Sequence, residues 1–90
     1  MSVRIHLHPD MVCLAGNNEI FEATGTTVGE CLGELIGQYP DVGELVFDED
    51  SRLKTFIEIY VNRTTTYPNE LGKEVSDGDE IHLLLTVAGG

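Results

Sequence analysis

Residues 77–90 have the sequence DGDEIHLLLTVAGG, in which a turn, a strand and the end of the chain follow one another directly. Gly78 lies among acidic residues, a composition typical of a tight turn in which glycine supplies a positive φ. The residues after it alternate as they do in a strand with one buried face. We expect the inner face to carry Ile81, Leu83, Leu85 and Val87, and the outer face to carry His82, Leu84 and Thr86.

The sequence ends on two glycines, Gly89 and Gly90. Because glycine lacks a Cβ, such a pair lets the backbone enter a narrow slot. We expect residues 1–86 to form the folded domain and residues 87–90 to form a flexible C-terminal tail that carries the α-carboxylate of Gly90. An ordinary frayed terminus is the alternative, since the ends of most domains are poorly ordered.

A strand is also predicted near the start, where residues 3–8 alternate between apolar and polar side chains. Its outer face would carry His6 and His8, because residues two apart share a face. With Cys13 these histidines suggest a metal site, but no further ligand of suitable spacing is visible, so we interpret them as surface histidines. A GNN turn leads into residues 19–23, which we expect to pair back on the first strand as a hairpin.

A single amphipathic helix is predicted next. Thr27 and Glu30 have the spacing of a capping box, and Pro40 ends the helix because the residue before a proline avoids the helical region. The apolar residues that recur at helical spacing are Val28, Cys31, Leu32, Leu35, Ile36 and Tyr39. Three glycines repeat at every fourth position: Gly29, Gly33 and Gly37. Close packing on the sheet and a flat solvent face both remain open for them.

The second half of the chain contains the strongest strand pattern, FIEIYVN at residues 56–62. Its inner row would be Ile57, Ile59 and Val61. Residues 41–55 show no clean period, although Leu45, Val46, Phe47 and Leu53 are expected beneath the sheet. The acidic loop at residues 48–50 is expected to be solvated, because a loop for a hard cation needs more ordered oxygen spacing. Leu71 would plug the core from the loop that follows.

The order strand, strand, helix, strand, turn and strand indicates the α+β class. We expect a mixed sheet of four to five strands packed on one main helix. The first and last strands would form the central pair, parallel and buried.

Composition limits the classes of partner. The chain has 90 residues, 41% of them apolar, and a formal net charge of −11 from five basic and sixteen acidic residues. This length fits one small domain. Nucleic acid and anionic membranes are excluded as partners, because binding phosphates requires Lys and Arg to displace counterions. A basic partner surface is the natural complement, although solubility alone also accounts for much of the charge.

A cytoplasmic protein is expected, because no apolar run approaches the roughly 18 residues of a membrane span and the start lacks the apolar stretch of a signal peptide. The cysteines Cys13 and Cys31 are too few for a disulfide scaffold or an iron–sulfur cluster. No CxxC is present, so neither a zinc site nor a redox motif is indicated. Cys31 lies on the apolar helical stripe and is interpreted as a core residue.

Four segments together resemble the ubiquitin-like sulfur carriers with the β-grasp fold. They are IYVN at residues 59–62, a loop with Leu71, DGDEIHL at residues 77–83 and the terminal VAGG. This family includes the small subunit of molybdopterin synthase, the thiamine sulfur carrier and the carrier used in a thiocarboxylate route to cysteine. The resemblance covers essentially the whole chain. Residues 53–62 look somewhat more like the cysteine-pathway carrier, whereas residues 77–90 fit the molybdopterin subunit equally well.

The resemblance implies a carrier and not an enzyme. A ubiquitin-activating-type enzyme would attach AMP from ATP to the carboxylate of Gly90. Sulfur from a sulfurtransferase or persulfide donor would displace AMP and leave a thiocarboxylate. That group would supply sulfur to an acceptor enzyme in molybdopterin or tungstopterin cofactor, cysteine or thiamine biosynthesis. The sequence agrees, because it shows no phosphate-binding glycine loop with lysine, no nucleophile-and-base pattern and no metal or cofactor motif.

On this interpretation Gly89 and Gly90 form the adenylation and thiocarboxylate site. The residues expected to dock partners are His82, Leu84, Val87 and Ala88, since an apolar side chain on a polar strand face is a reasonable anchor. Two functions of other classes remain open. One is a protein modifier joined to lysines through Gly90, and the other is an interaction-only β-grasp domain whose tail is passive.

Overall fold

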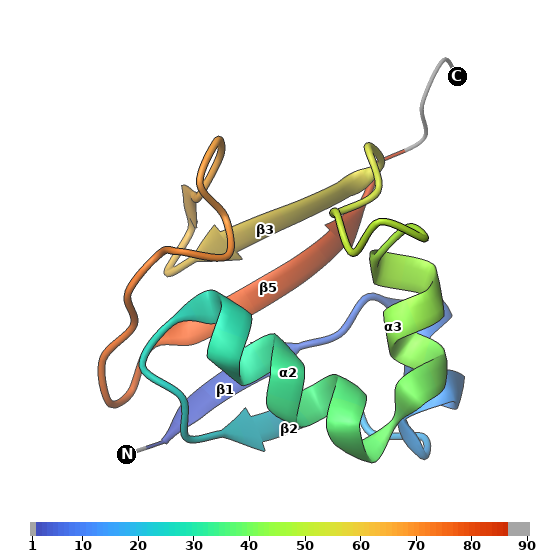
Figure 1. Cartoon of the computed structure of the whole chain (residues 1–90). Helices are drawn as coiled ribbons and strands as arrows, with labels where there is room; N and C mark the ends of the chain where they lie inside the picture. The colour runs from blue at the N-terminus through green and yellow to red at the C-terminus, as the bar shows by residue number, and fades with distance from the viewer. Residues whose placement is uncertain (1, 87–90) are drawn as a thin grey trace.

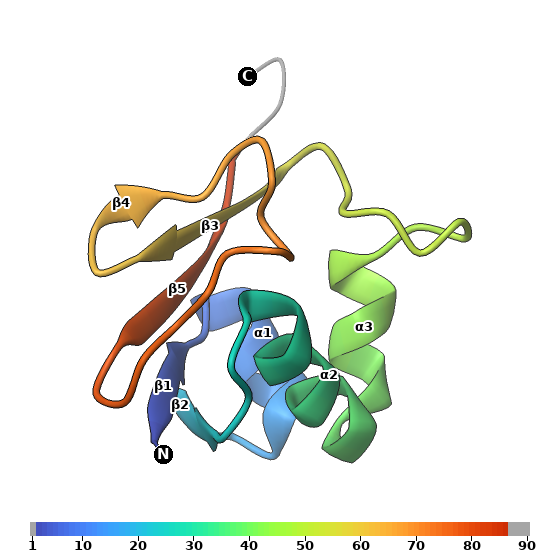
Figure 2. The same ribbon diagram turned by 60° about the vertical axis from the view of Figure 1, so that its left-hand side comes forward.

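Five strands and three helices make up the computed structural model, which describes residues 2–86 (Figure 1). The strands are β1 (Val3–His6), β2 (Ile20–Ala23), β3 (Ile57–Val61), β4 (Thr64–Thr65) and β5 (Glu80–Leu85). The helices are α1 (Pro9–Val12), α2 (Val28–Gln38) and α3 (Pro40–Val46), with a 3-10 turn over Cys13–Ala15. Figure 2 shows α2 and α3 on the same side of the sheet. Among the described residues, no helix has the length and apolar character needed to cross a membrane.

All five strands form one mixed sheet in the order β2-β1-β5-β3-β4. The first and last strands are parallel neighbours at its centre, with Ile5 opposite Ile81 and His6 opposite His82. On the outer sides, β2 pairs antiparallel with β1, and β3 pairs antiparallel with β5. The predicted α+β class, the hairpin and the parallel central pair are therefore confirmed.

The core lies between the sheet and α2. Buried residues from the strands are Val3, Ile5, Ala23, Ile57, Ile59, Val61, Ile81 and Leu83, and those from α2 are Val28, Cys31, Leu32 and Leu35. These are the inner faces that the alternation and the helical spacing predict. Burial raises the pKa of the Cys31 thiol, so this cysteine is held protonated in the core and is not poised as a nucleophile.

The predicted capping box of α2 is present, but the Glu30 side chain bonds to Thr26 and not to the N-cap residue Thr27. The Thr27 hydroxyl accepts a hydrogen bond from the Glu30 backbone N–H at 3.1 Å. The Glu30 carboxylate in turn accepts bonds from the backbone N–H and the hydroxyl of Thr26, at 2.7 and 2.8 Å. The first turn of α2 is thus tied to the chain that enters it.

Replacing Glu30 with Gln is expected to make the stability of the fold less dependent on pH. The hydrogen bonds from Thr26 lower the pKa of Glu30. A carboxylate whose folded-state pKa is lowered contributes stability above its unfolded pKa of about 4.3, and this stability is lost as the pH falls through the folded-state pKa. Urea unfolding should therefore show Glu30→Gln less stable than the wild type near neutral pH, with the gap closing in acid. A difference in stability between the two proteins that does not change with pH would contradict a lowered pKa of Glu30.

The helix α3, which begins at Pro40, occupies the first part of residues 41–55, the segment that shows no clean period in the sequence. Pro40 is its first residue, where the fixed φ of proline suits a helix and the missing N–H costs nothing. The residue that ends α2 therefore also begins α3. The sequence pattern does not reveal this helix, but Val46 is buried and Leu45, Phe47 and Leu53 pack against the core as predicted.

The strand β1 is shorter than residues 3–8, because the chain turns into α1 after Leu7. His8 is the N-cap of α1, and its Nδ1 accepts a hydrogen bond from the Asp10 backbone N–H at 3.1 Å. The prediction that His6 and His8 share the outer face of one strand is therefore wrong. Leu7 nevertheless remains buried, and Met11 of α1 adds a core residue that the alternation does not reveal.

The three glycines of α2 lie in two different environments. The Gly29 backbone N–H donates to the Leu71 carbonyl at 2.9 Å, and a Cβ on Gly29 would lie 2.9 Å from the same oxygen. An added Cβ on Gly33 or Gly37 would have no atom within 4 Å outside the helix's own neighbouring backbone. Close packing thus explains Gly29, whereas Gly33 and Gly37 lie on an open face.

Alanine at Gly33 and alanine at Gly29 are expected to change stability in opposite directions. Gly33→Ala removes backbone freedom from the unfolded chain without a clash, which should raise the free energy of unfolding by about 0.5–1 kcal/mol. Gly29→Ala should lower it, because the oxygen that its Cβ meets belongs to backbone and must shift. Urea unfolding of the two variants tests this, and a change of the same sign in both would contradict the packing described.

Candidate functional site

The strand β5 carries the chain from the centre of the sheet to the last described residue, Thr86. It is held on both sides, by β1 and by β3. The backbone N–H of Thr86 donates to the Phe56 carbonyl at 2.7 Å, and its hydroxyl donates to the same oxygen at 3.2 Å. Whatever follows Thr86 is therefore attached to a fixed point at the end of β5. The predicted site residues Gly89 and Gly90, and the docking candidates Val87 and Ala88, lie outside the described residues.

His82 and Leu84 lie on the face of β5 that points away from the helices, as the alternation predicts. The side chain of Leu84 is 40% exposed, which is unusual for a large apolar residue in this chain. In register, Leu84 is opposite Glu58 of β3 and His82 is opposite Tyr60. This outer face thus offers an apolar anchor among polar neighbours, close to the end of β5.

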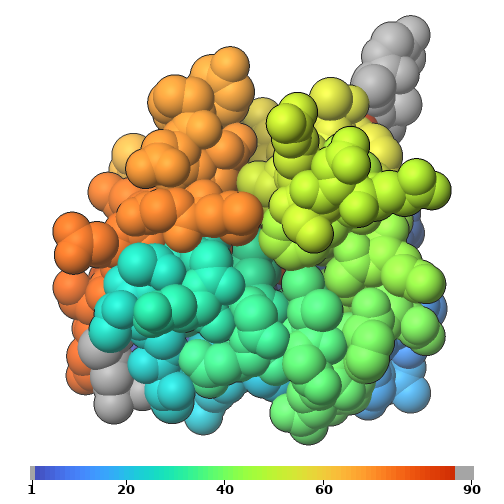
Figure 3. All heavy atoms as spheres, in the orientation of Figure 1, coloured from blue at the N-terminus to red at the C-terminus, as the bar shows by residue number. Residues whose placement is uncertain are grey.

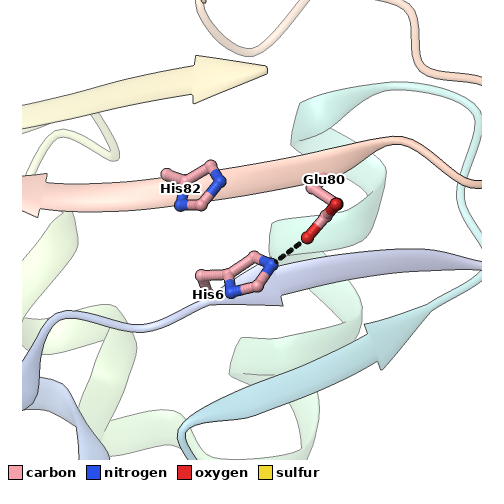
Figure 4. A group of neighbouring side chains, drawn as sticks. All are labelled: His6, Glu80 and His82. Carbon is pink, nitrogen blue, oxygen red and sulfur yellow. Dashed lines mark hydrogen bonds and ion pairs between the residues drawn. The ribbon is translucent and has the colours of Figure 1, made fainter. Parts of the chain in front are cut away.

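A cluster of three polar side chains, those of His6, Glu80 and His82, stands on the outer face of the sheet (Figure 4). The rings of His6 and His82 are stacked, with centroids 4.3 Å apart and planes inclined by 11°. Nε2 of His6 lies 2.5 Å from Oε1 of Glu80. The hydrogen bond to His6 lowers the pKa of Glu80, and burial, with the neighbouring His6, lowers the pKa of His82. These shifts favour an ionised Glu80 and a neutral His82 near pH 7.

Sequence reasoning placed His6 with His8 and Cys13, and the structure does not bring these three together. His8 lies beside Asp10, with Nδ1 and Oδ2 3.9 Å apart, and Cys13 is exposed in the 3-10 turn. His6 instead meets His82, from the opposite end of the sequence. The signal that points to this contact is the parallel pairing of the first and last strands, which brings the two outer faces together.

The face covered by α2 and α3 is hollowed by a groove of about 800 Å³ (Figure 3). Its apolar lining includes Ile36 of α2, Phe47 after α3, and Leu71. Asp48 and Glu49 of the acidic loop also line the groove. The Asp48 carboxylate accepts hydrogen bonds from the backbone N–H groups of Asp50 and Arg52. The carboxylate therefore shapes its own loop, in keeping with the solvated loop that the sequence predicts.

The chain is similar to several known proteins along most of its length. It matches the ThiS family model over residues 9–90. The sulfur carrier protein CysO of Mycobacterium tuberculosis is 32% identical over 78 residues, which cover 83% of this chain and 84% of the relative. The small archaeal modifier protein 1 of Haloferax volcanii is 31% identical over 86 residues, covering 93% and 95%. A chain of the Amycolatopsis orientalis BexX/CysO complex has a TM-score of 0.86 at 29% identity, covering 98% of this chain and 99% of that one.

Proposed function

Because this chain belongs to the ThiS family of ubiquitin-like sulfur carriers, we propose that it carries sulfur as a thiocarboxylate on Gly90. Its mixed sheet and helices form the β-grasp fold of these proteins. The observation that carries the proposal is the family match, which continues through the two glycines to residue 90.

The chemistry that we propose starts from a poor acyl donor, the carboxylate of Gly90. An oxygen of this carboxylate attacks the α-phosphorus of ATP and pyrophosphate leaves, which forms a mixed anhydride with AMP. Sulfur from a persulfide donor then attacks the carbonyl carbon and AMP leaves. This attack forms an acyl disulfide between Gly90 and the donor. A thiol then attacks the donor-side sulfur of its S–S bond and forms a disulfide with the donor, and the C-terminal thiocarboxylate leaves as the product. An acceptor enzyme finally takes the sulfur.

We assign the catalysts of these steps to partner proteins. The partners are a ubiquitin-activating-type enzyme that binds ATP, a sulfurtransferase or persulfide donor, and a sulfur-acceptor enzyme. In this proposal residues 1–86 form the folded domain that partners recognise, and residues 87–90 form the tail that enters their active sites. The hydrogen bonds of Thr86 to Phe56 support the proposal, because they give the tail a fixed origin. The net charge of −11 suits partners with basic docking surfaces, and a cytoplasmic location completes the proposal.

The docking surface is proposed to be the outer face of β5. Leu84 supplies the apolar contact, and His82 supplies a part-buried polar neighbour. Both stand on the same strand as the tail, so a partner that accepts Gly89 and Gly90 in a slot can contact them at the same time. Val87 and Ala88 are proposed to enter the mouth of that slot.

The relatives named CysO favour a cysteine-forming acceptor over the molybdopterin or thiamine routes. A second function, attachment to lysines of target proteins through Gly90, is favoured by the similarity to the small archaeal modifier protein 1. Both functions share the adenylation step and differ in the nucleophile that follows.

The two functions can be separated by purifying the protein from its own cells under denaturing conditions. A carrier is expected as free protein, with a share of it ending in a thiocarboxylate that alkylating reagents label. A modifier is expected in higher-mass conjugates whose digestion leaves the C-terminal glycines on lysine side chains. Free protein with neither the label nor conjugates would contradict both functions and favour a β-grasp interaction domain.

A further inference from the structure

We propose that His6, Glu80 and His82 form a binding site for a divalent transition-metal ion, with Zn²⁺ as the best match, on the outer face of the sheet (Figure 4). One ligand atom from each residue lies within 4.8 Å of the other two. The site is independent of the carboxylate chemistry at Gly90 and would be present in a chain whose tail is removed.

The fold itself places these three side chains together. Glu80 and His82 are two residues apart on β5, so their side chains share a face. The parallel register puts His6 of β1 directly opposite His82, and Arg4 directly opposite Glu80. These two residue pairs occupy four adjacent positions on neighbouring strands, and three of the four carry groups that can bind a metal ion. The fourth, Arg4, is exposed, so its long side chain can extend into solvent.

The donor set suits Zn²⁺ more than a hard cation. Imidazole nitrogen with one carboxylate oxygen is a common zinc combination, whereas Ca²⁺ and Mg²⁺ prefer sites made of oxygen alone. Three protein ligands leave one tetrahedral position for water or for a side chain of a docked partner. That open position would be on the same face as the exposed Leu84.

The side chains must rotate to close the site, because the lone pair of an imidazole lies in the ring plane and the stacked rings of His6 and His82 have to tilt toward one another. Two ligands bound tetrahedrally to one zinc ion at about 2.0–2.2 Å are about 3.4 Å apart. Ligand atoms that are up to 4.8 Å apart would therefore approach by at most about 1.4 Å, whereas Nε2 of His6 and Oε1 of Glu80, now 2.5 Å apart, would separate by about 0.9 Å. The side chains of His6 and Glu80 are 28% and 40% exposed, so they can turn without disturbing the core. Nε2 of His6 and Oε1 of Glu80 already share a hydrogen bond, and a metal ion bound between them would take the place of its proton.

The charge of the molecule adds to the attraction of a cation. The chain carries a net charge of −11, and the Glu80 carboxylate stands within the cluster. A high negative charge alone does not make a specific metal site. Scattered surface carboxylates bind divalent ions weakly and do not favour metals such as Zn²⁺ that prefer imidazole ligands. The test must therefore separate binding at the histidines from binding to acidic surface.

The chain offers a matched control for this purpose, because it has only three histidines and His8 is the one outside the cluster. The full chain, made without a histidine tag, would be titrated with Zn²⁺ in a calorimeter. We expect one ion per chain. The substitutions His6→Gln and His82→Gln should each weaken binding by at least about tenfold, since even an outer-shell partner of a metal site costs 10–100-fold. His8→Gln should leave the affinity unchanged.

A second readout guards against variants that do not fold. Zn²⁺ should raise the midpoint of thermal unfolding of the wild type and of His8→Gln, because a ligand of the folded state stabilises it, and it should not raise that of His82→Gln. Circular dichroism of each variant without metal confirms folding. Glu80→Gln should weaken Zn²⁺ binding less than either histidine substitution, because both imidazoles remain as ligands. The proposal is overturned if the wild type shows no saturable Zn²⁺ binding, if His8→Gln weakens binding as much as His82→Gln, or if the double variant of His6 and His82 binds as the wild type does.

Discussion

A chain that lacks Gly90 is expected to accept no AMP and no sulfur, while its β-grasp domain stays folded. The loss should be complete, because deletion moves the reacting carboxylate back by one residue, and activating enzymes act on a carbonyl that must be placed within a fraction of an ångström. Reconstitution with the cognate activating enzyme, ATP and a persulfide donor measures this as AMP released and sulfur bound. Circular dichroism and thermal unfolding should match those of the full chain.

Gly89→Val extends the same prediction without changing the chain length. A β-branched side chain at the second-last position restricts the backbone and widens the tail, so loading should fall steeply. Gly37→Ala is the matched control, because a Cβ there meets no atom within 4 Å apart from the helix's own neighbouring backbone. This control should load as the wild type does. Loading of the Gly90 deletion at the rate of the full chain would mean that the tail is passive.

Ile81→Ala is expected to have the largest effect on stability among the substitutions considered. Ile81 is fully buried on β5, and its register partners are Ile5 on one side and Val61 on the other. Truncating a buried isoleucine costs about 2–5 kcal/mol, which is a large part of the roughly 5–15 kcal/mol that stabilises a typical domain. The free energy of unfolding in urea measures the loss directly.

Leu84→Ala is the control for this substitution, because Leu84 lies on the same strand with its side chain on the outer face. Because its side chain is 40% exposed, truncation should lower the free energy of unfolding by only about 1 kcal/mol, well below the loss expected for Ile81→Ala. It should instead weaken docking to the activating enzyme if the outer face of β5 is the docking surface. Equal destabilisation by the two substitutions would contradict the assignment of Ile81 to the buried face of β5 and of Leu84 to its outer face.

Local patterns in the sequence predicted the parts of the fold that depend on a repeating period. The alternation in β1, β3 and β5 identified the buried rows, and the apolar spacing with the capping box identified α2. The helix α1 is one turn long and α3 only seven residues, too short for a helical period to stand out. Pro9 and Pro40 begin these two helices, but a proline at that position also fits the end of the preceding element.

The sequence does not reveal the His6–Glu80–His82 cluster, because the cluster depends on strand register, which no local pattern supplies. Alternation states which face a side chain occupies, but the offset between two strands is set by how their whole surfaces pack. The alternation therefore groups His6 with His8, two residues along the chain, whereas in the structure His6 lies opposite His82. The site at Gly89 and Gly90 was predicted through the resemblance to sulfur carriers, since a pair of glycines has no distinctive chemistry of its own.

The most direct test of the carrier proposal is the intact mass of the protein after incubation with its cognate activating enzyme, ATP and a persulfide donor. We expect a gain equal to the exchange of one oxygen for one sulfur, with fragmentation placing it at Gly90. An unchanged mass with all cognate components present and active would contradict it.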